Sequence, residues 1–164
     1  MARTDPNNRA RYWADRRMQG LSLLHADFTR HDYAPHRHDA LVVAVTELGG
    51  AEFSSRGRSD EARPDVMMVF NPDEPHSGRM GRSARWRYRS LYLDSCALDG
   101  LKAGLGIDAL PYFTRNLFTD RDLVAGFLAL HRALDVGEDA GETMLAGFGA
   151  LFRRHGSGDR RALA

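Results

Sequence analysis

The 164-residue sequence lacks several features that would assign it to a class at once. It has a single cysteine, Cys96, so no disulfide can form within the chain, which is typical of a protein kept in the reducing cytoplasm. No segment approaches the ~18 consecutive apolar residues of a membrane helix. The first 17 residues also lack the apolar core of a signal peptide. We therefore expect a cytoplasmic protein without a membrane partner, in which Cys96 is a small buried side chain.

A large charge of one sign is missing as well. The formal net charge is +1, so composition gives no argument for or against a nucleic-acid partner. Lys102 is the only lysine, and we give the resulting arginine bias little functional weight. With 43% apolar and 27% charged residues, the chain has the composition and length of one globular domain with a real core.

Short apolar or alternating segments separated by turn residues fill residues 20–94. They are "LSLLHADF", "HDALVVAVTEL", "AEFSSRGRSDEA", "DVMMVF" and "WRYRSLYLD". The third is expected to form a hairpin that turns near Gly57, where positive φ costs little. Many short strands at this spacing predict a β-sandwich or β-barrel.

The periodicity becomes helical after Asp94. "SCALDGLKAGLG" predicts a short helix with Asp94 or Ser95 as its N-cap. After the extended, aromatic segment "PYFTRNLF", two longer helices are expected in "TDRDLVAGFLALHRALDVG" and "EDAGETMLAGFGALFRRHG". Thr119 or Asp120 is the expected N-cap of the first of them. The fold class is therefore predicted to be mainly β with C-terminal α, a barrel followed by a helical hairpin.

Three histidines follow a spacing that suits a common site. His36 and His38 are expected to share one face of a strand because side chains alternate, and His76 follows the turn "NPDEP". Three converging imidazoles can bind zinc, iron, nickel or copper. They can equally contact a bound molecule without a metal, or only satisfy backbone groups at the rim of a barrel. All three interpretations stay open.

The segment "WRYRSLYL" carries an aromatic face and an arginine-containing face. Trp86, Tyr88, Ser90 and Tyr92 share the first. Since arginine is costly to bury unpaired, we expect the aromatic face to point into the barrel. These side chains either fill the core or supply stacking area and hydroxyl groups to a small-molecule pocket.

Two segments resemble the two cupin motifs. In "HRHDALVVAVTELG" the paired histidines are His36 and His38 and the closing glycine is Gly49, and in "DVMMVFNPDEPH" the closing histidine is His76. Several other identities of the second motif differ. Val42 stands where metal-dependent cupin enzymes have a glutamate, so the resemblance implies a metal site without its carboxylate ligand.

Residues 11–156 resemble one branch more closely, the N-terminal sensor domain of AraC-family bacterial transcription regulators. The shared features are the Arg-Gly-Arg hairpin at residues 56–58, the Asn-Pro-x-x-Pro-His turn ending at His76, and the aromatic strand "WRYRSLYL". "PYFTRN" and the two longer helices follow in the family's order. The resemblance implies a cupin-like barrel of the double-stranded β-helix or jelly-roll type, with a small effector bound inside it.

We expect the effector to contact one set of side chains, with a metal held by three of them as the weaker alternative. The expected ligand-binding residues are His36, His38, Val42, His76, Trp86, Tyr88, Ser90 and Tyr92, and the metal ligands would be His36, His38 and His76, holding zinc, nickel or iron.

The two longer helices carry apolar faces that either pack on the barrel or form a symmetric homodimer. The resemblance favours the dimer. The residues of this expected interface are Leu123, Phe127, Leu130, Leu134, Leu145, Phe148 and Phe152.

The resemblance also divides the chain. We expect an N-terminal arm (1–17) that covers the effector through Tyr12 and Trp13, a barrel (18–94), a helical dimerisation region (95–156) and a linker (157–164). In the family, paired helix-turn-helix units C-terminal to the sensor bind DNA, and no such unit is visible before Ala164. We therefore expect a sensor fragment of a regulator, which is not an enzyme.

The runner-up is a metal-dependent cupin oxygenase or isomerase using the three histidines, and a third class is a non-catalytic storage cupin.

Overall fold

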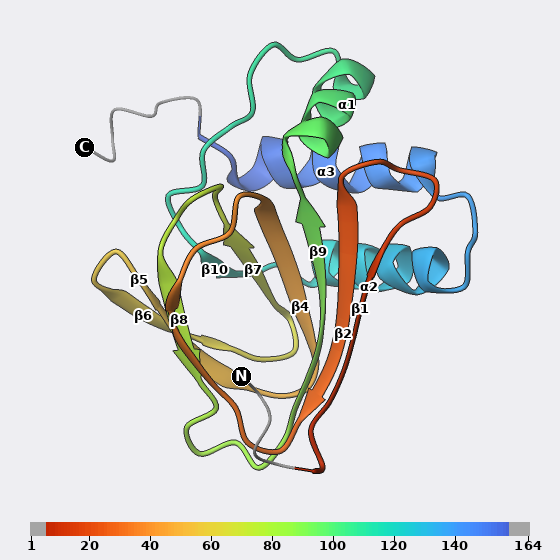
Figure 1. The fold of residues 1–164 in the computed structure, drawn as a ribbon. Helices are drawn as coiled ribbons and strands as arrows, with labels where there is room; N and C mark the ends of the chain where they lie inside the picture. The colour runs from red at the N-terminus through yellow and green to blue at the C-terminus, as the bar shows by residue number, and fades with distance from the viewer. Residues whose placement is uncertain (1–5, 158–164) are drawn as a thin grey trace.

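A computed structural model describes residues 6–157 of the protein as strands followed by helices (Figure 1). The strands are β1 (Arg9–Ala14), β2 (Leu21–Phe28), β3 (Asp32–His36), β4 (Leu41–Gly49), β5 (Ala51–Ser55), β6 (Arg58–Ala62), β7 (Val66–Phe70), β8 (His76–Arg79), β9 (Trp86–Leu93) and β10 (Leu117–Thr119). The helices are α1 (Ser95–Leu105), α2 (Arg121–Asp135) and α3 (Gly141–His155).

The strands form two antiparallel sheets. The six-stranded sheet has the order β1-β2-β9-β4-β7-β10, and the four-stranded sheet has the order β3-β8-β5-β6. Strands distant in sequence lie side by side in both, as in β9 between β2 and β4. The predicted fold class, mainly β and cupin-like with C-terminal helices, is confirmed.

The hairpin between β5 and β6 turns where the sequence predicts it. Arg56 and Gly57 occupy the two turn positions with φ of 51° and 74°, as a two-residue hairpin turn of right-handed strands requires. The register that follows pairs Ser55 with Arg58 and Ala51 with Ala62.

The six-stranded sheet has an apolar core on each face. One core lies between the two sheets and includes Phe53, Phe70 and Trp86. The other lies between the outer face of this sheet and the helices and includes Leu91 and Phe127. Figure 1 shows α2 and α3 together against this outer face, so each face of β9 borders a different core.

The caps of α1 and α2 follow the predictions. The carboxylate of Asp94 accepts hydrogen bonds from the amides of Cys96 and Ala97, and Asp120 accepts one from the amide of Leu123. Cys96 itself is exposed, so the expectation that it is buried was wrong. It occupies the first turn of α1, on the side of the helix that faces solvent.

The N-terminal segment joins the sheet. Residues Arg9–Ala14 form β1, an edge strand paired with β2 along its length. Residues 1–5 of the predicted arm and residues 158–164 of the predicted linker lie outside the described residues. None of the described helices is long and apolar enough to cross a membrane.

Candidate functional site

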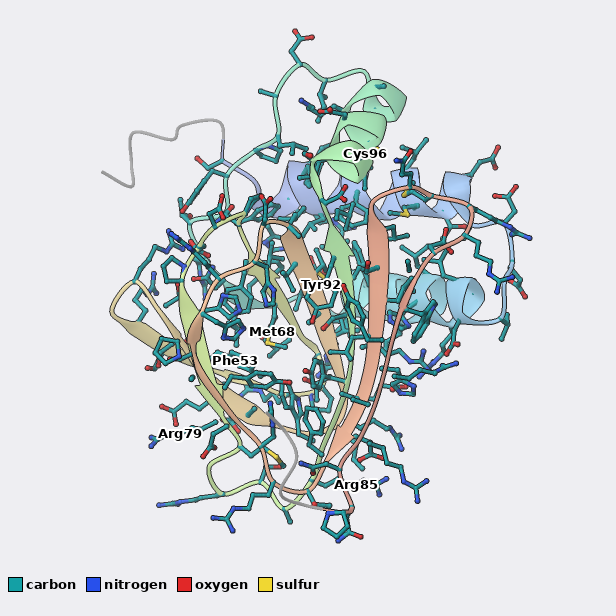
Figure 2. All side chains as sticks on the ribbon, in the orientation of Figure 1. Phe53, Met68, Arg79, Arg85, Tyr92 and Cys96 are labelled. Atoms are coloured by element: carbon teal, nitrogen blue, oxygen red, sulfur yellow. The ribbon has the colours of Figure 1, made fainter. Side chains whose placement is uncertain are left out.

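A cavity opens between the two sheets, with about 430 Å³ of space including its mouth. Its walls are Tyr33, His36, His38, Val42, Ala44, Phe53, Met68, Phe70, His76, Trp86, Tyr88, Ser90 and Tyr92. Figure 2 shows Phe53, Met68 and Tyr92 pointing into this space from β5, β7 and β9. The structure thus brings all eight residues of the predicted ligand-binding set to one cavity. Whether they bind a ligand stays a prediction.

The strand register of the six-stranded sheet builds one wall of the cavity in two rows. Phe70, Val42 and Tyr92 stand side by side on β7, β4 and β9. Met68, Ala44 and Ser90 form the next row on the same strands. Because side chains alternate, both rows face the four-stranded sheet.

Five lining residues were missed by the sequence analysis. Ala44, Met68 and Phe70 could have been found by continuing the alternation along β4 and β7. Tyr33 and Phe53 come from the four-stranded sheet, and only the long-range pairing of β3 and β5 with β8 places them opposite the aromatic strand.

The three predicted histidines converge at the cavity. Their ligand atoms all lie within 4.8 Å of one another. His36 ends β3 and pairs with His76 at the start of β8, whereas His38 lies in the loop before β4. The expectation that His36 and His38 share one strand face was therefore wrong, and the loop brings His38 to the group instead.

Two of these imidazoles are held by the backbone. Nδ1 of His36 donates to the carbonyl of Ala34 at 2.7 Å, and Nδ1 of His76 donates to the carbonyl of Glu74 at 3.0 Å. A carbonyl can only accept, so these bonds place the proton on Nδ1 and leave Nε2 with its lone pair. Burial lowers the pKa of His76 to about 4, although the bond to Glu74 opposes that shift. Burial, followed by the nearby His36, also lowers the pKa of His38.

These donor atoms fit a divalent metal. Protein ligands of zinc, nickel and iron are commonly imidazole nitrogens whose other nitrogen donates to a backbone carbonyl. Within residues 6–157, no aspartate or glutamate joins the histidine group. Val42 lies in the cavity wall, where the cupin pattern has a carboxylate. The residues therefore fit a metal held by three nitrogens, with its remaining positions open to the cavity.

Phenols and aromatic rings make up most of the remaining wall. The hydroxyls of Tyr33 and Tyr88 are hydrogen bonded to each other. Burial raises the pKa of both, and it raises the pKa of Tyr92 to about 12. Trp86 stacks on Tyr88 with ring centroids 3.8 Å apart. None of the thirteen lining residues is Asp, Glu, Lys or Arg, so the lining has no formal charge while its imidazoles are neutral.

A buried charged network lies behind the cavity, on the outer face of β9. Arg89, only 9% exposed, lies 3.2 Å from both Glu47 and Asp135. Its Nε approaches Glu47 outside hydrogen-bonding geometry, so that contact is ionic. Arg89 also donates to Nδ1 of His131 at 2.9 Å. The arginine face of the strand does point outward as predicted, but at Arg89 it is buried and paired.

The N-terminal strand β1 contacts both the cavity and the charged network on the opposite face of the sheet. Tyr12 is 64% exposed, and its ring contacts the cavity residue Tyr92 with centroids 5.8 Å apart. Trp13 points to the opposite face of the sheet, where its ring lies 5.7 Å from that of His131. Of the two residues expected to cover the effector, only Tyr12 lies beside a cavity residue.

The predicted dimer faces lie largely inside this single chain. Leu123, Phe127, Leu130, Leu134 and Phe148 are buried in the core between the six-stranded sheet and the helices. Leu145 and Phe152 are partly buried and pack against the same core. Packing on the chain's own sheet thus accounts for the apolar faces of α2 and α3, and the dimer interface stays a prediction.

The family model of the AraC-like ligand binding domain matches residues 19–151 of this sequence. The chain belongs to this family. The match spans β2 to α3 and includes every residue that lines the cavity. No curated protein matches the sequence.

Solved structures are similar to this AraC-like ligand-binding domain at low sequence identity. AerE from Microcystis aeruginosa is 11% identical with a TM-score of 0.54 over 71% of this chain. The chain spans about half of AerE, 49% of its length. A cupin 2 conserved barrel domain protein from Salinispora arenicola is 16% identical with a TM-score of 0.49, covering 60% of this chain and 85% of that protein.

Proposed function

We propose that this domain senses a small molecule bound in the cavity between the sheets and forms the effector-binding part of an AraC-like transcription regulator. The observation that carries the proposal is the convergence of the eight predicted residues on one partly buried cavity. Aromatic walls with a few fixed polar groups are the usual composition of a small-molecule site. In this proposal the protein is not an enzyme and acts in the cytoplasm.

A screen with a matched pair of variants tests the sensing role. Ala44→Leu adds a bulky side chain to the cavity wall, whereas Ala125→Leu adds the same side chain to the exposed surface of α2. Compounds that raise the melting temperature of the wild-type protein should lose that effect with Ala44→Leu and keep it with Ala125→Leu. Equal effects on both variants would place the binding site elsewhere.

We also propose that the α2–α3 hairpin forms a homodimer and that DNA is bound only through a C-terminal helix-turn-helix region of the full regulator. The residues predicted for the interface are largely buried, but exposed residues of the same helices, such as Ala129 and Ala146, are available to a partner. Ala129→Arg should therefore yield a monomer in sedimentation velocity, while Ala84→Arg, at an exposed position in the loop between β8 and β9, serves as the control. The reading frame that encodes the region after residue 164 should contain two helix-turn-helix patterns.

The arm is proposed to respond to the effector through Tyr12. Deleting residues 1–17 would also remove β1 from the sheet, so Tyr12→Ala is the sharper change. It should alter effector affinity, whereas Arg9→Ala on the same strand should not. Unchanged affinity with Tyr12→Ala would exclude this role.

The second candidate function is a metal-dependent cupin oxygenase or isomerase. The backbone-bonded Nδ1 atoms of His36 and His76 favour it, since they leave Nε2 for a metal. Zinc, nickel or iron bound there would supply a Lewis acid at the cavity wall. Stoichiometric metal in the purified protein, lost in the His36→Ala/His38→Ala double variant, would support this function. Metal-free protein of normal stability would exclude it.

A further inference from the structure

Hydrogen-bond acceptors and donors lie at different ends of the cavity, and this arrangement bears on the chemical class of its ligand. At the histidine end, the Nδ1 hydrogens of His36 and His76 are used by the carbonyls of Ala34 and Glu74. No hydrogen bond to either Nε2 atom is present within the described part of the chain. His36 and His76 therefore offer two acceptors and no donor, and the neutral ring of His38 beside them adds one N–H and one further acceptor.

The phenol end has the opposite character. Tyr33 and Tyr88 together carry two hydroxyl hydrogens, and the bond between them uses one. The other hydrogen is left to donate to an acceptor oxygen. The rings of Tyr33 and His36 are 5.9 Å apart, so one small molecule can reach both ends of the cavity.

An anion is poorly suited to such a cavity. A carboxylate has no hydrogen to donate to the two Nε2 acceptors. The lining contains no arginine or lysine to balance its charge. An ion buried without a partner of opposite charge loses its hydration without compensation.

We propose that the metal-free cavity selects an uncharged molecule, which donates hydrogen bonds to Nε2 of His36 and His76, over an anion of the same shape. The ligand accepts one hydrogen bond from the Tyr33–Tyr88 pair. Its apolar face packs against the stacked rings of Trp86 and Tyr88. The inference rests on the proposed sensing function and names the class of effector.

Two matched probe pairs test the inference at pH 8 on protein freed of metal by a chelator. Benzamide and benzoate have the same ring, but only benzamide is neutral and carries N–H donors. Glucose and glucuronate make the same comparison for a sugar. In titration calorimetry, at least one neutral probe should bind, and its anionic partner should bind at least about tenfold more weakly.

A variant pair ties the effect to the histidine acceptor. His36→Phe keeps an aromatic ring and removes Nε2, so it should weaken the neutral probe about tenfold. His155→Phe, on α3 outside the cavity, should leave the affinity unchanged. If His36→Phe does not fold, the Tyr33→Phe/Tyr88→Phe double variant removes the donor at the other end and should weaken the same probe.

The outcomes separate this inference from the sensing function. An anionic probe that binds as tightly as its neutral partner, and loses affinity with His36→Phe, overturns the neutral class but keeps the cavity as a binding site. Neutral probes that bind equally to wild type, His36→Phe and the double tyrosine variant overturn both. Failure of both neutral probes to bind also overturns the proposed ligand class.

Discussion

Nε2 of His131 on α2 donates a hydrogen bond to the backbone carbonyl of Ser90 on β9 at 3.1 Å. Ser90 lines the cavity on the other face of the same strand. Because Nδ1 of His131 accepts from Arg89, the imidazole is neutral and has both nitrogens satisfied. The wall of the cavity is thus hydrogen bonded directly to the helical layer.

The state of His131 makes stability depend on pH. Burial, followed by the charge of Arg89, lowers its pKa to about 4, although the hydrogen bond to Ser90 and, to a smaller extent, Asp135 oppose that shift. The folded protein therefore favours the neutral ring, and this stability is present above pH ~6.5 and is lost as pH falls toward 4. A shift of this size corresponds to about 3 kcal/mol. Urea unfolding between pH 7 and pH 4 should show this loss.

His131→Gln separates this contribution from the other titrating groups. Glutamine can donate to Ser90 and accept from Arg89, but it does not titrate. The variant should therefore lose less stability than the wild type between pH 7 and pH 4, while the neighbouring His25, Glu47 and Asp135 are unchanged. Parallel pH profiles for the two proteins would contradict the assignment.

Glu47 is predicted to make a large contribution to stability that is also lost on acidification, but in a more acidic pH range than that of His131. Burial alone would raise its pKa, but the hydrogen bond from Arg132 and the nearby Arg89 and His25 outweigh burial and lower the pKa to about 2. A lowered carboxyl pKa stabilises the fold above pH ~4.5, and the stability is lost as pH falls toward 2. Glu47→Gln should cost about 2–4 kcal/mol at pH 7, since it leaves Arg89 short of a counter-charge.

The comparison with an exposed glutamate controls for the loss of a charge. Glu61 is exposed and lies 3.8 Å from Arg63, so Glu61→Gln should change the unfolding free energy by less than about 0.5 kcal/mol. The deficit of Glu47→Gln should shrink as the pH falls below ~4.5, because Glu47 then becomes protonated in the unfolded wild-type chain while it stays ionised in the folded protein. A deficit that does not change with pH would show that packing, and not charge, is lost.

Local patterns were sufficient to predict most of the fold. The strand "LSLLHADF" coincides with β2, and the Arg-Gly turn, the Asp94 and Asp120 caps and the inward aromatic face of β9 follow from alternation and capping rules. The short strands β3 and β8 were not predicted. β3 contains a proline and β8 a glycine, and they form because β8 pairs with both β3 and β5.

Apart from the three histidines, only the cavity residues of the six-stranded sheet could be predicted from the sequence. Residues of β4 and β9 could be assigned to the cavity from the period of two. The charged network around Arg89 could not be predicted in this way. Nothing in the local segments "VTEL" and "LALHRALD" indicates that Glu47 and His131 both approach Arg89. The burial of the helix faces against the sheet likewise depends on the tertiary arrangement, and amphipathic periodicity alone does not distinguish it from a dimer interface.

Gly78 should be required for the shape of the cavity. A Cβ at this position of β8 would lie 2.6 Å from the ring of Phe53, which lines the cavity. That ring is confined by Phe70 and Trp86, with centroids 5.9 and 5.4 Å away. Gly78→Ala should therefore cost about 1–3 kcal/mol through overpacking, measured by chemical denaturation.

The control for this change is Gly126→Ala on α2, where an added Cβ meets no atom within 4 Å. Alanine has the higher helix propensity, so this variant should be as stable as the wild type or gain up to about 1 kcal/mol. An equally small effect of Gly78→Ala would mean that Phe53 has room to move into the cavity.

Val42→Glu should convert the histidine group into a stronger metal site. Val42 stands between Phe70 and Tyr92 in the cavity wall that the three histidines share. A carboxylate there adds a fourth protein ligand, so the affinity for zinc or nickel should rise at least about tenfold in calorimetric titrations at pH 7.5. Val42→Gln, of nearly the same size, should give a smaller gain because a neutral amide is a weaker ligand.

The stability of Val42→Glu without metal provides the complementary measurement. In the chelator-treated protein the new carboxylate lies in an apolar wall without a counter-charge, which should lower stability by a few kcal/mol. Zinc should raise the melting temperature of this variant more than that of the wild type. A ligand that binds only the folded state stabilises it more the tighter it binds. A variant that is destabilised without metal and gains nothing from it would show that position 42 does not reach the ligand atoms of His36, His38 and His76.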